Sequence, residues 1–346
     1  MKAMLLNKLC NLNDTPSPLV LTEIPVPVPG DAEILLKVSC CGVCHTELDE
    51  IEGRTPPLNL PIVPGHQVVG RVVALGKSVI HLKVGDRIGV AWIFTACGKC
   101  KFCLAGNENL CPDFLATGRD ANGGYAEYMT VAGHFAYVIP EIFSDVEAAP
   151  LLCAGAIGYR ALRLTQHKDG QSLGLTGFGA SGHLVLKMAK HLYPHTQVYV
   201  FARSLEERQF ALSLGANWAG NTTETSPVKL DNIIDTTPAW LPVVEALANL
   251  EAGGRLVINA IRKEHDKESL LQLDYSKHLW QEKEIKSVAN ITRADVTEFL
   301  SLAADMHLKP EVEVYDLELA NQALLALKQG NICGAKVLVV GQSLLS

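Results

Sequence analysis

Residues 172–202, SLGLTGFGASGHLVLKMAKHLYPHTQVYVFA, decide the fold of the middle of this chain. An apolar, strand-like run ends in a glycine-rich turn, a helical pattern follows over residues 183–193, and a second strand-like run closes the segment. After about Cys153 further apolar runs, such as NIIDTT (232–237) and GRLVINA (254–260), alternate with helical stretches. This alternation predicts an α/β architecture with a doubly wound parallel sheet.

Three glycines follow the first of these strands in the pattern G-x-G-x-x-G: Gly177, Gly179 and Gly182. Between a strand and a helix, the first glycine permits a tight turn and the second lets a pyrophosphate approach the backbone. The third lets the helix pack on the strand, and the helix N-terminus points its amide groups at the anion. The pattern in this setting predicts a dinucleotide cofactor, NAD or NADP.

The end of the next strand bears on the choice between these two cofactors. Enzymes that use NAD commonly place Asp or Glu there to bind the ribose hydroxyls, whereas this chain has Ala202, Arg203 and Ser204. Arg203 and Ser204 could bind a 2′-phosphate, so the sequence modestly favours NADP. Alternatively, Arg203 pairs with Glu206 or Glu207 at a solvated helix start.

Before Cys153 the chain has a different pattern of apolar and turn-forming residues. Short β-branched or aromatic runs are separated by Gly, Pro and Asp turn signals, which predicts an antiparallel β-barrel. The clearest runs are ILLKVSCCGV (34–43), QVVGRVVAL (67–75), RIGVAW (87–92) and YAEYMTVAG (125–133). A final strand, AKVLVV (335–340), is expected to rejoin the barrel. We therefore predict a first domain of residues 1–153, a dinucleotide-binding domain of residues 154–292, and a return to the first domain over residues 293–346.

Length and composition fit a globular protein of two domains. The chain has 346 residues, of which 48% are hydrophobic and 19% are charged, as in ordinary folded proteins. The net charge of −7 offers no basic surface, which argues against nucleic acid as a partner. No stretch reaches the roughly 18 apolar residues of a membrane span, and the start lacks a secretory signal. We expect no membrane partner and a cytoplasmic protein with reduced thiols.

Four cysteines, Cys97, Cys100, Cys103 and Cys111, form the pattern C-x2-C-x2-C-x7-C. Three closely spaced thiolates can wrap one ion, and a fourth completes a tetrahedral sulfur shell, which is the arrangement of a structural zinc. An iron–sulfur cluster would use the same ligands, but the spacing differs from the common ferredoxin patterns. Redox-active cysteines, or a zinc ribbon that binds a partner or nucleic acid, are the remaining alternatives.

A second group of metal-ligand types is spread along the chain: Cys44, His66 and Cys153. Two thiolates and one imidazole leave the fourth tetrahedral position open, as in a catalytic zinc site that binds an alcohol. Taken singly, His66 and Cys153 would more often be buried residues without a metal. Whether the fold brings the three together is left open by the sequence.

The segment GHQVVGRVVALGKSV (65–79) resembles the signature of the zinc-dependent medium-chain alcohol dehydrogenases at Gly65, His66, Gly70, Gly76 and Val79. CGVCHTE (41–47), the four-cysteine lobe and GFGASGH (177–183) occur in the order and at the spacing of that family. The resemblance implies a GroES-like β-barrel catalytic domain plus a Rossmann domain. It also implies two zinc ions per chain, one catalytic on Cys44, His66 and Cys153 and one structural on the four cysteines. The implied reaction transfers a hydride between a primary or secondary alcohol and NAD(P).

The resemblance also implies roles for residues near the predicted catalytic zinc. Thr46 would accept the proton of the alcohol, and His45 would lie near the cofactor phosphates. Glu47 and Gln67 would surround the zinc ligands. Walls of the substrate pocket are expected from Ile51, Thr55 and Trp92.

Three positions depart from the family pattern. Gln67 replaces the usual Glu after the zinc histidine, so a negative charge near the zinc is missing there, which should lower the pKa of the bound alcohol. Asp49 stands where relatives often carry a proton-relay histidine, so the relay is altered or ends in water. Ala335 lies close to where many relatives place a phosphate-binding arginine.

The resemblance leaves the substrate and the assembly open. A polyol dehydrogenase or aldehyde reductase of the same superfamily, or a catalytically inactive zinc-binding relative, are the alternatives. A small-molecule alcohol or aldehyde is the expected partner. Relatives form dimers and tetramers, so a homo-oligomer is also expected.

Overall fold

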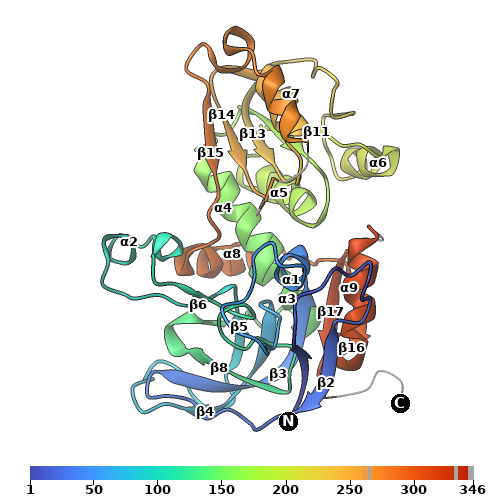
Figure 1. Cartoon of the computed structure of the whole chain (residues 1–346). Coiled ribbons are helices and arrows are strands. Elements are labelled where there is room, and N and C mark those ends of the chain that lie inside the picture. The colour runs from blue at the N-terminus through green and yellow to red at the C-terminus, as the bar shows by residue number, and fades with distance from the viewer. Residues whose placement is uncertain (261, 264–265, 331–333, 342–346) are drawn as a thin grey trace. The chain divides into compact units, whose positions relative to one another are not determined.

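The computed structural model describes residues 1–260, 262–263, 266–330 and 334–341 (Figure 1). It contains two compact units: unit 1 comprises Met1–Cys153 and Ile291–Ser346, and unit 2 comprises Ala154–Asn290. Residues 331–333 and 342–346 of the predicted segment 293–346 lie outside the described residues. Over the described part of the chain, no helix combines the length and the hydropathy needed to cross a membrane.

The largest sheet of unit 1 is mixed and has the strand order β16-β17-β3-β4-β5-β9, with β8 pairing β3. The strands of unit 1 are β1 (Lys2–Leu6), β2 (Leu19–Glu23), β3 (Glu33–Val43), β4 (Val68–Leu75), β5 (Arg87–Val90), β6 (Ile93–Thr95), β7 (Leu115–Ala116), β8 (Tyr128–Ala132), β9 (Ala136–Val138), β16 (Val312–Asp316) and β17 (Ala335–Val339). The first half of β3 pairs β8, and its second half pairs β17. The closing strand therefore rejoins the first part of the chain, as predicted.

The helices of unit 1 are short, apart from one. They are α1 (His45–Ile51), α2 (Lys101–Leu104), η1 (Glu108–Leu110), η2 (Gly133–Phe135), α3 (Asp145–Pro150), α8 (Arg293–Asp305), η6 (Leu317–Leu319) and α9 (Ala320–Lys328). A π-helical segment, η3 (Leu151–Gly155), runs from unit 1 into unit 2. Capping boxes start α3 at Ser144 and α8 at Thr292, each with an acidic residue three positions later that bonds back to the cap.

Unit 2 is built on a six-stranded parallel sheet with the order β12-β11-β10-β13-β14-β15. Its strands are β10 (Ser172–Thr176), β11 (Gln197–Phe201), β12 (Trp218–Gly220), β13 (Leu230–Asp235), β14 (Leu250–Ile258) and β15 (Glu284–Ser287), and its helices are α4 (Ala156–Thr165), α5 (Ala180–Leu192), α6 (Leu205–Ser213), α7 (Leu241–Asn249), η4 (Lys267–Gln272) and η5 (Tyr275–Leu279). The central strands are buried along most of their length, because both sheet faces are covered. The predicted doubly wound parallel sheet is confirmed.

The strand order of unit 2 reverses direction between β10 and β13. From β10 the chain moves outward to β11 and β12, and it then returns to place β13 on the other side of β10. Ligands of doubly wound sheets bind at the carboxyl ends of the strands at such a reversal. The glycine-rich turn after Thr176 lies at this position.

Candidate active site and metal centres

Helix α1 begins at the first residue of the predicted catalytic zinc set. Cys44 is the N-cap of this helix, and its Sγ accepts a hydrogen bond from Thr46 N at 3.5 Å. Glu47 Oε2 accepts from Cys44 N at 2.8 Å, which completes a capping box. The cap therefore fixes the thiol, the hydroxyl of Thr46 and the carboxylate of Glu47 on one turn of helix.

His66 and Cys153 converge on Cys44 from two other parts of unit 1. Cys44 Sγ and Cys153 Sγ are 3.9 Å apart, and His66 Nε2 lies 3.3 Å from Cys153 Sγ. The three ligand atoms all lie within 4.8 Å of one another. Sulfur atoms around a tetrahedral zinc are about 3.8 Å apart when each Zn–S bond is about 2.3 Å. The geometry and the chemistry of this donor set therefore fit zinc with one open position.

The electrostatics of the three ligands also favour a cation. The hydrogen bond from Cys153 holds the pKa of the Cys44 thiol well below its usual range. Burial lowers the pKa of His66, but the neighbouring Glu47 and Cys44 outweigh burial and raise that pKa well above its usual value. A positive charge is therefore stabilised among these groups, and a metal ion would supply it.

The buried carboxyl group of Glu47 lies next to the zinc-ligand candidate His66. Glu47 Oε1 is 2.5 Å from His66 Nδ1, and both side chains are almost completely buried. A carboxylate behind a ligating histidine fixes the ring and its tautomer. The carboxyl group that Gln67 does not supply is thus present at Glu47, where burial raises the pKa although His66 opposes this shift. Gln67 itself is buried, and its side-chain oxygen lies so close to Gly42 that a Cβ there would be only 2.7 Å away.

Glu50 is a site residue that sequence reasoning missed. Its side chain is 1% exposed, and neither carboxyl oxygen has a hydrogen-bond partner among the described residues. Burial, together with the charge of Glu47, raises its pKa well above the usual value. The protonated form of Glu50 is therefore favoured more strongly than in an exposed carboxyl group. The i,i+3 spacing of Glu47 and Glu50 on a short helix was the only available signal.

Thr46 and Asp49 lie on the same helix but in different surroundings. Thr46 is 8% exposed, and its Oγ1 is 3.5 Å from Cys44 Sγ. Asp49 is completely buried, and its Oδ1 accepts from Arg54 Nε at 2.8 Å. The charge of Asp49 is therefore balanced by Arg54, a residue that sequence reasoning did not single out.

The three residues predicted to line the substrate pocket, Ile51, Thr55 and Trp92, lie in different surroundings. Ile51 is completely buried in the core of unit 1. Thr55 Oγ1 and Trp92 Nε1 are buried and have no hydrogen-bond partner among the described residues. The Arg119 guanidinium lies 5.1 Å from the centroid of the Trp92 ring. The role of these three residues as walls of a substrate pocket stays a prediction.

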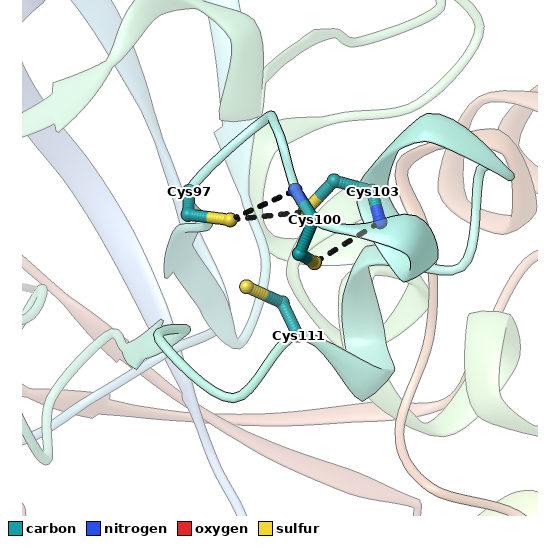
Figure 2. A group of neighbouring side chains, drawn as sticks. All are labelled: Cys97, Cys100, Cys103 and Cys111. Atoms are coloured by element: carbon teal, nitrogen blue, oxygen red, sulfur yellow. Dashed lines mark hydrogen bonds between the residues drawn. The ribbon is translucent and has the colours of Figure 1, made fainter.

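The four cysteines of the lobe face one another (Figure 2). Cys97 Sγ and Cys103 Sγ are 3.9 Å apart, and backbone amides donate to two of the sulfurs, Cys100 N to Cys97 and Cys103 N to Cys100. Backbone hydrogen bonds from Lys99 and Cys100 lower the pKa of Cys97 to about 7. The four sulfurs lie within 4.8 Å of one another, which fits the ligand set of a structural zinc.

A charged contact holds this lobe to another element of unit 1. Glu108, which is 2% exposed, accepts from Arg293 N at 2.7 Å and from Arg293 Nε at 3.0 Å. Arg293 is the first residue of α8. A carboxylate at a helix N-terminus is stabilised by the free amides and the helix dipole.

The glycine-rich turn of unit 2 has the shape of an anion site. Gly177 has φ +78, and a Cβ on Gly182 would lie 2.7 Å from the carbonyl oxygen of Gly177. Apart from Gly179 and its chain neighbours, no atom of the described residues lies within 4 Å of the Cβ position of Gly179, which is the N-cap of α5 and has no side-chain cap. The open backbone and the uncapped helix start fit the pyrophosphate of a dinucleotide.

The residues after β11 bear on the 2′-phosphate. Ala202 is buried, Arg203 is exposed, and Ser204 caps α6 by accepting from Glu207 N at 3.1 Å. Within the described chain no ion pair joins Arg203 to Glu206 or Glu207. His45 is also exposed, at the first position of α1 in unit 1.

Comparison with known proteins identifies the class. Residues 30–141 match the alcohol dehydrogenase GroES-like domain. The chain is 42% identical to a probable alcohol dehydrogenase, AdhA, of Mycobacterium tuberculosis over 93% of this chain and 92% of that protein. It is 34% identical to an alcohol dehydrogenase of Geobacillus stearothermophilus over 94% of this chain and 97% of that protein. The fold matches a cinnamyl alcohol dehydrogenase of Sorghum bicolor with a TM-score of 0.82 and 26% identity, over 98% of this chain and 97% of that chain.

The chain therefore belongs to the zinc-dependent medium-chain alcohol dehydrogenases. It is an NAD(P)-dependent oxidoreductase that acts on small-molecule alcohols or aldehydes. The predicted GroES-like barrel and Rossmann domain are confirmed.

Proposed function

We propose that Cys44, His66 and Cys153 hold the catalytic zinc of this alcohol dehydrogenase, and that the four lobe cysteines hold a structural zinc. The convergence of two thiols and one imidazole within 4.8 Å, with Glu47 behind the imidazole, carries the proposal. When bound, the zinc ion supplies a Lewis acid for the alcohol oxygen and NAD(P)+ accepts the hydride. The protein side chains orient the alcohol and remove its proton.

Thr46 is the residue that we propose takes this proton. Its hydroxyl lies 3.5 Å from Cys44 Sγ and can accept one proton while it passes its own onward. Asp49 is the proposed next acceptor, with Arg54 holding its charge in place. If Asp49 serves in this way, Asp49→Asn should depress alcohol oxidation most at low pH. An unchanged pH profile would mean that the proton leaves through water.

NADP is the cofactor that we propose this enzyme prefers. Ala202 offers no carboxylate to the ribose, and Arg203 is exposed without an ion pair to Glu206 or Glu207 in the described chain. A charge-assisted contact to a 2′-phosphate contributes about 1.5 to 3 kcal/mol, which is roughly tenfold or more in affinity. The test compares kcat/KM for NADPH and NADH in the wild type and in Arg203→Ala. A wild type that prefers NADH, or a ratio that the substitution leaves unchanged, contradicts the proposal.

Metal analysis and steady-state assays together test the main proposal. Two zinc ions per chain are expected, with turnover of ethanol or benzyl alcohol, whereas turnover of sorbitol alone would indicate a polyol dehydrogenase. Cys153→Ser should remove one zinc and abolish turnover while the fold survives. A single zinc in the wild type, or full activity of Cys153→Ser, contradicts the assignment.

We further propose that the enzyme works as a homo-oligomer in the cytoplasm. The edge strand β15 has neighbours on one side only in the described sheet, and its residues are exposed. An unpaired, exposed edge can pair with a second copy. Two sets of metal-ligating thiols favour a reducing compartment.

A further inference from the structure

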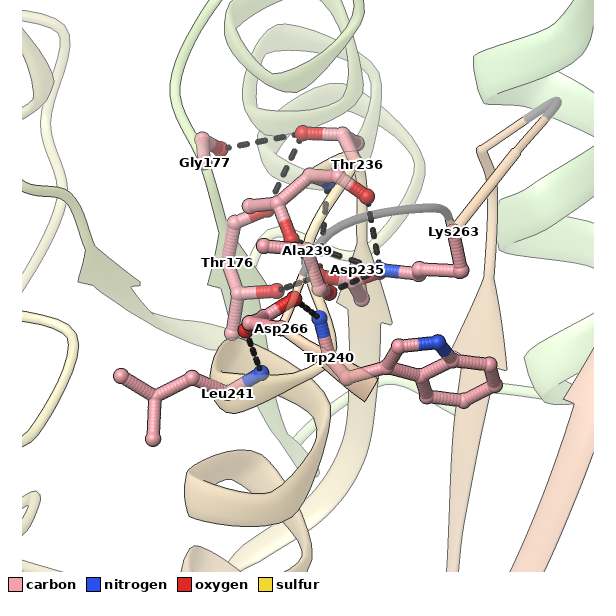
Figure 3. Close-up of polar contacts among 10 residues, drawn as sticks. Thr176, Gly177, Asp235, Thr236, Ala239, Trp240, Leu241, Lys263 and Asp266 are labelled. Atoms are coloured by element: carbon pink, nitrogen blue, oxygen red, sulfur yellow. Dashed lines mark hydrogen bonds and ion pairs between the residues drawn. The ribbon is translucent and has the colours of Figure 1, made fainter. Parts of the chain in front are cut away.

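A buried polar cluster lies directly behind the first glycine of the cofactor turn (Figure 3). Asp235 ends β13 and is completely buried, and Thr176 ends the neighbouring strand β10. Thr176 Oγ1 donates to Asp235 Oδ1 at 2.6 Å. Thr236 Oγ1 lies 3.0 Å from Thr176 O and 3.4 Å from Gly177 O. The Asp235 carboxylate therefore contacts Thr176, which directly precedes Gly177, the first residue of the turn that is proposed to receive the cofactor phosphates.

Lys263 pairs with this buried carboxylate. Its ammonium forms an ion pair with Asp235 Oδ2, and the lysine side chain is only 7% exposed. The same ammonium donates to Thr237 O at 2.6 Å and to Ala239 O at 2.8 Å. Three partners use the three donors of an ammonium group. Lys263 is thus committed to protein groups rather than to a ligand.

The remaining charge of the cluster lies on Asp266. Its two carboxylate oxygens accept from Trp240 N at 2.9 Å and Leu241 N at 2.8 Å, at the start of α7. These backbone bonds outweigh partial burial and lower the pKa of Asp266, so it stays ionised. Without Lys263, two carboxylates would face the carboxyl end of the sheet, and one of them would be fully buried behind Gly177.

An uncompensated buried carboxylate at this place would oppose the cofactor. The pyrophosphate of NAD(P) is anionic, and charges in a poorly solvated interior interact more strongly than in water. The helix dipole of α5 favours an anion at the turn, and a nearby negative charge would cancel part of that field. Neutralisation of Asp235 would therefore favour the binding of a dinucleotide at this turn.

We propose that Lys263 is a cofactor-positioning residue, which neutralises Asp235 behind Gly177 and so lets the anionic dinucleotide bind to the glycine-rich turn. The inference rests on the proposed cofactor site and adds a residue to it. Lys263 acts through Asp235 and does not touch the cofactor. A lysine that bound phosphate directly would instead be needed whether or not Asp235 carries a charge.

The test measures the Kd for NADPH by fluorescence titration of the zinc-loaded enzyme, without turnover. Lys263→Met should raise the Kd about three- to tenfold, because it leaves Asp235 unpaired. Lys263→Arg should keep the Kd within about twofold of the wild type, since it keeps the charge. The double variant with Asp235→Asn and Lys263→Met should bind nearly as tightly as the wild type. Asp235→Asn alone should bind NADPH as tightly as the wild type or more tightly.

The thermal midpoint of each variant separates this role from a merely structural one. The inference is wrong if Asp235→Asn weakens NADPH binding as much as Lys263→Met does, and if the rise in Kd of each variant follows the fall in its thermal midpoint. It is also wrong if the double variant binds as weakly as Lys263→Met. If Lys263→Met does not fold, the Kd values of Asp235→Asn and of the double variant still show whether the charge of Asp235 weakens NADPH binding. Failure of the wild type to bind NADPH or NADH would instead overturn the proposed cofactor site.

Discussion

At the scale of single residues, the contact between Glu47 and His66 is expected to control the zinc affinity and the turnover of the proposed site. Glu47 Oε1 lies 2.5 Å from His66 Nδ1, and Glu47 Oε2 accepts from Cys44 N at 2.8 Å. Glu47→Gln keeps the shape but removes the charge. We expect a loss of about 10- to 100-fold in zinc affinity or kcat, as is usual for partners of ligating histidines. Competition with a chelator and steady-state kinetics measure the two quantities.

Glu251→Gln is the matched control for Glu47→Gln. Glu251 is an exposed carboxylate of unit 2, and its substitution should change neither quantity. Equal effects of the two substitutions would show that the charge behind His66 has no special role.

Both groups of proposed zinc ligands could be named from the sequence, because their residue types and spacing are typical of metal sites. The cysteine lobe is local, so its spacing of two residues determines its geometry. Cys44, His66 and Cys153 are far apart in the sequence, and only the folded chain brings them within 4.8 Å. Glu50 and Lys263 carried no comparable signal, since their importance depends on burial and on neighbours from other strands.

At the scale of elements, the cysteine lobe should behave as a stability element. Its four sulfurs converge, and Glu108 joins it to the first residue of α8. Cys103→Ser opens the sulfur shell, so it should remove one zinc and lower the thermal midpoint, because structural zinc binding is coupled to folding. Differential scanning calorimetry with metal analysis checks this result. Cys153→Ser should lose one zinc with a much smaller change of midpoint, and equal losses would contradict the two assignments.

His167 gives a pH-dependent contact between elements of unit 2. The residue follows α4, is 6% exposed, and lies 2.8 Å from Thr196 Oγ1 through Nε2. Burial lowers its pKa below the usual value of 6.5. The folded state therefore favours the neutral ring, whereas the unfolded chain takes up a proton below about pH 6.5. Stability contributed by the neutral ring is complete above that pH and is lost as the pH falls to the folded pKa.

His167→Gln should flatten this pH dependence. The substitution should reduce the slope of the unfolding free energy against pH by at most about 1.4 kcal/mol per pH unit, in the window just below pH 6.5. Hydrogen exchange of the β13 amides, measured between pH 5 and 7, reports the local stability. Exposed His191→Gln is the control and should leave the slope unchanged. A slope that His167→Gln does not alter would show that other groups titrate in this window.

Long elements were easier to predict than short ones. The alternation after Cys153 predicted the parallel sheet because buried strands and amphipathic helices have different periods. The two-residue strand β7 and the π-helical segment η3 gave no such pattern, since one or two turns contain too few residues to show a period. Their conformations follow from tertiary contacts.

At the scale of the whole molecule, the chain leaves unit 1 after Cys153 and returns at Ile291. Cys153, a proposed zinc ligand, is thus the last residue of unit 1 before unit 2 begins. The chain between this proposed zinc ligand and β10, the first strand of the parallel sheet, contains α4. The return of β17 to β3 closes unit 1, so its first and last segments stabilise each other.

At the same scale, strand β15 is the expected site of contact between copies of the chain. Strand β15 pairs only β14 in the described sheet, and Ile285 and the nearby Trp280 are 46% and 57% exposed. Unpaired backbone groups with apolar side chains on an edge strand favour pairing with a second copy across a two-fold axis. Ile285→Lys places a charge on this edge and should shift the enzyme toward monomers in sedimentation velocity. Val228→Lys, at a valine of unit 2 that is 43% exposed, is the matched control and should keep the wild-type mass. If Ile285→Lys also keeps the wild-type mass, or if the wild type is itself a monomer, the β15 edge is not the interface.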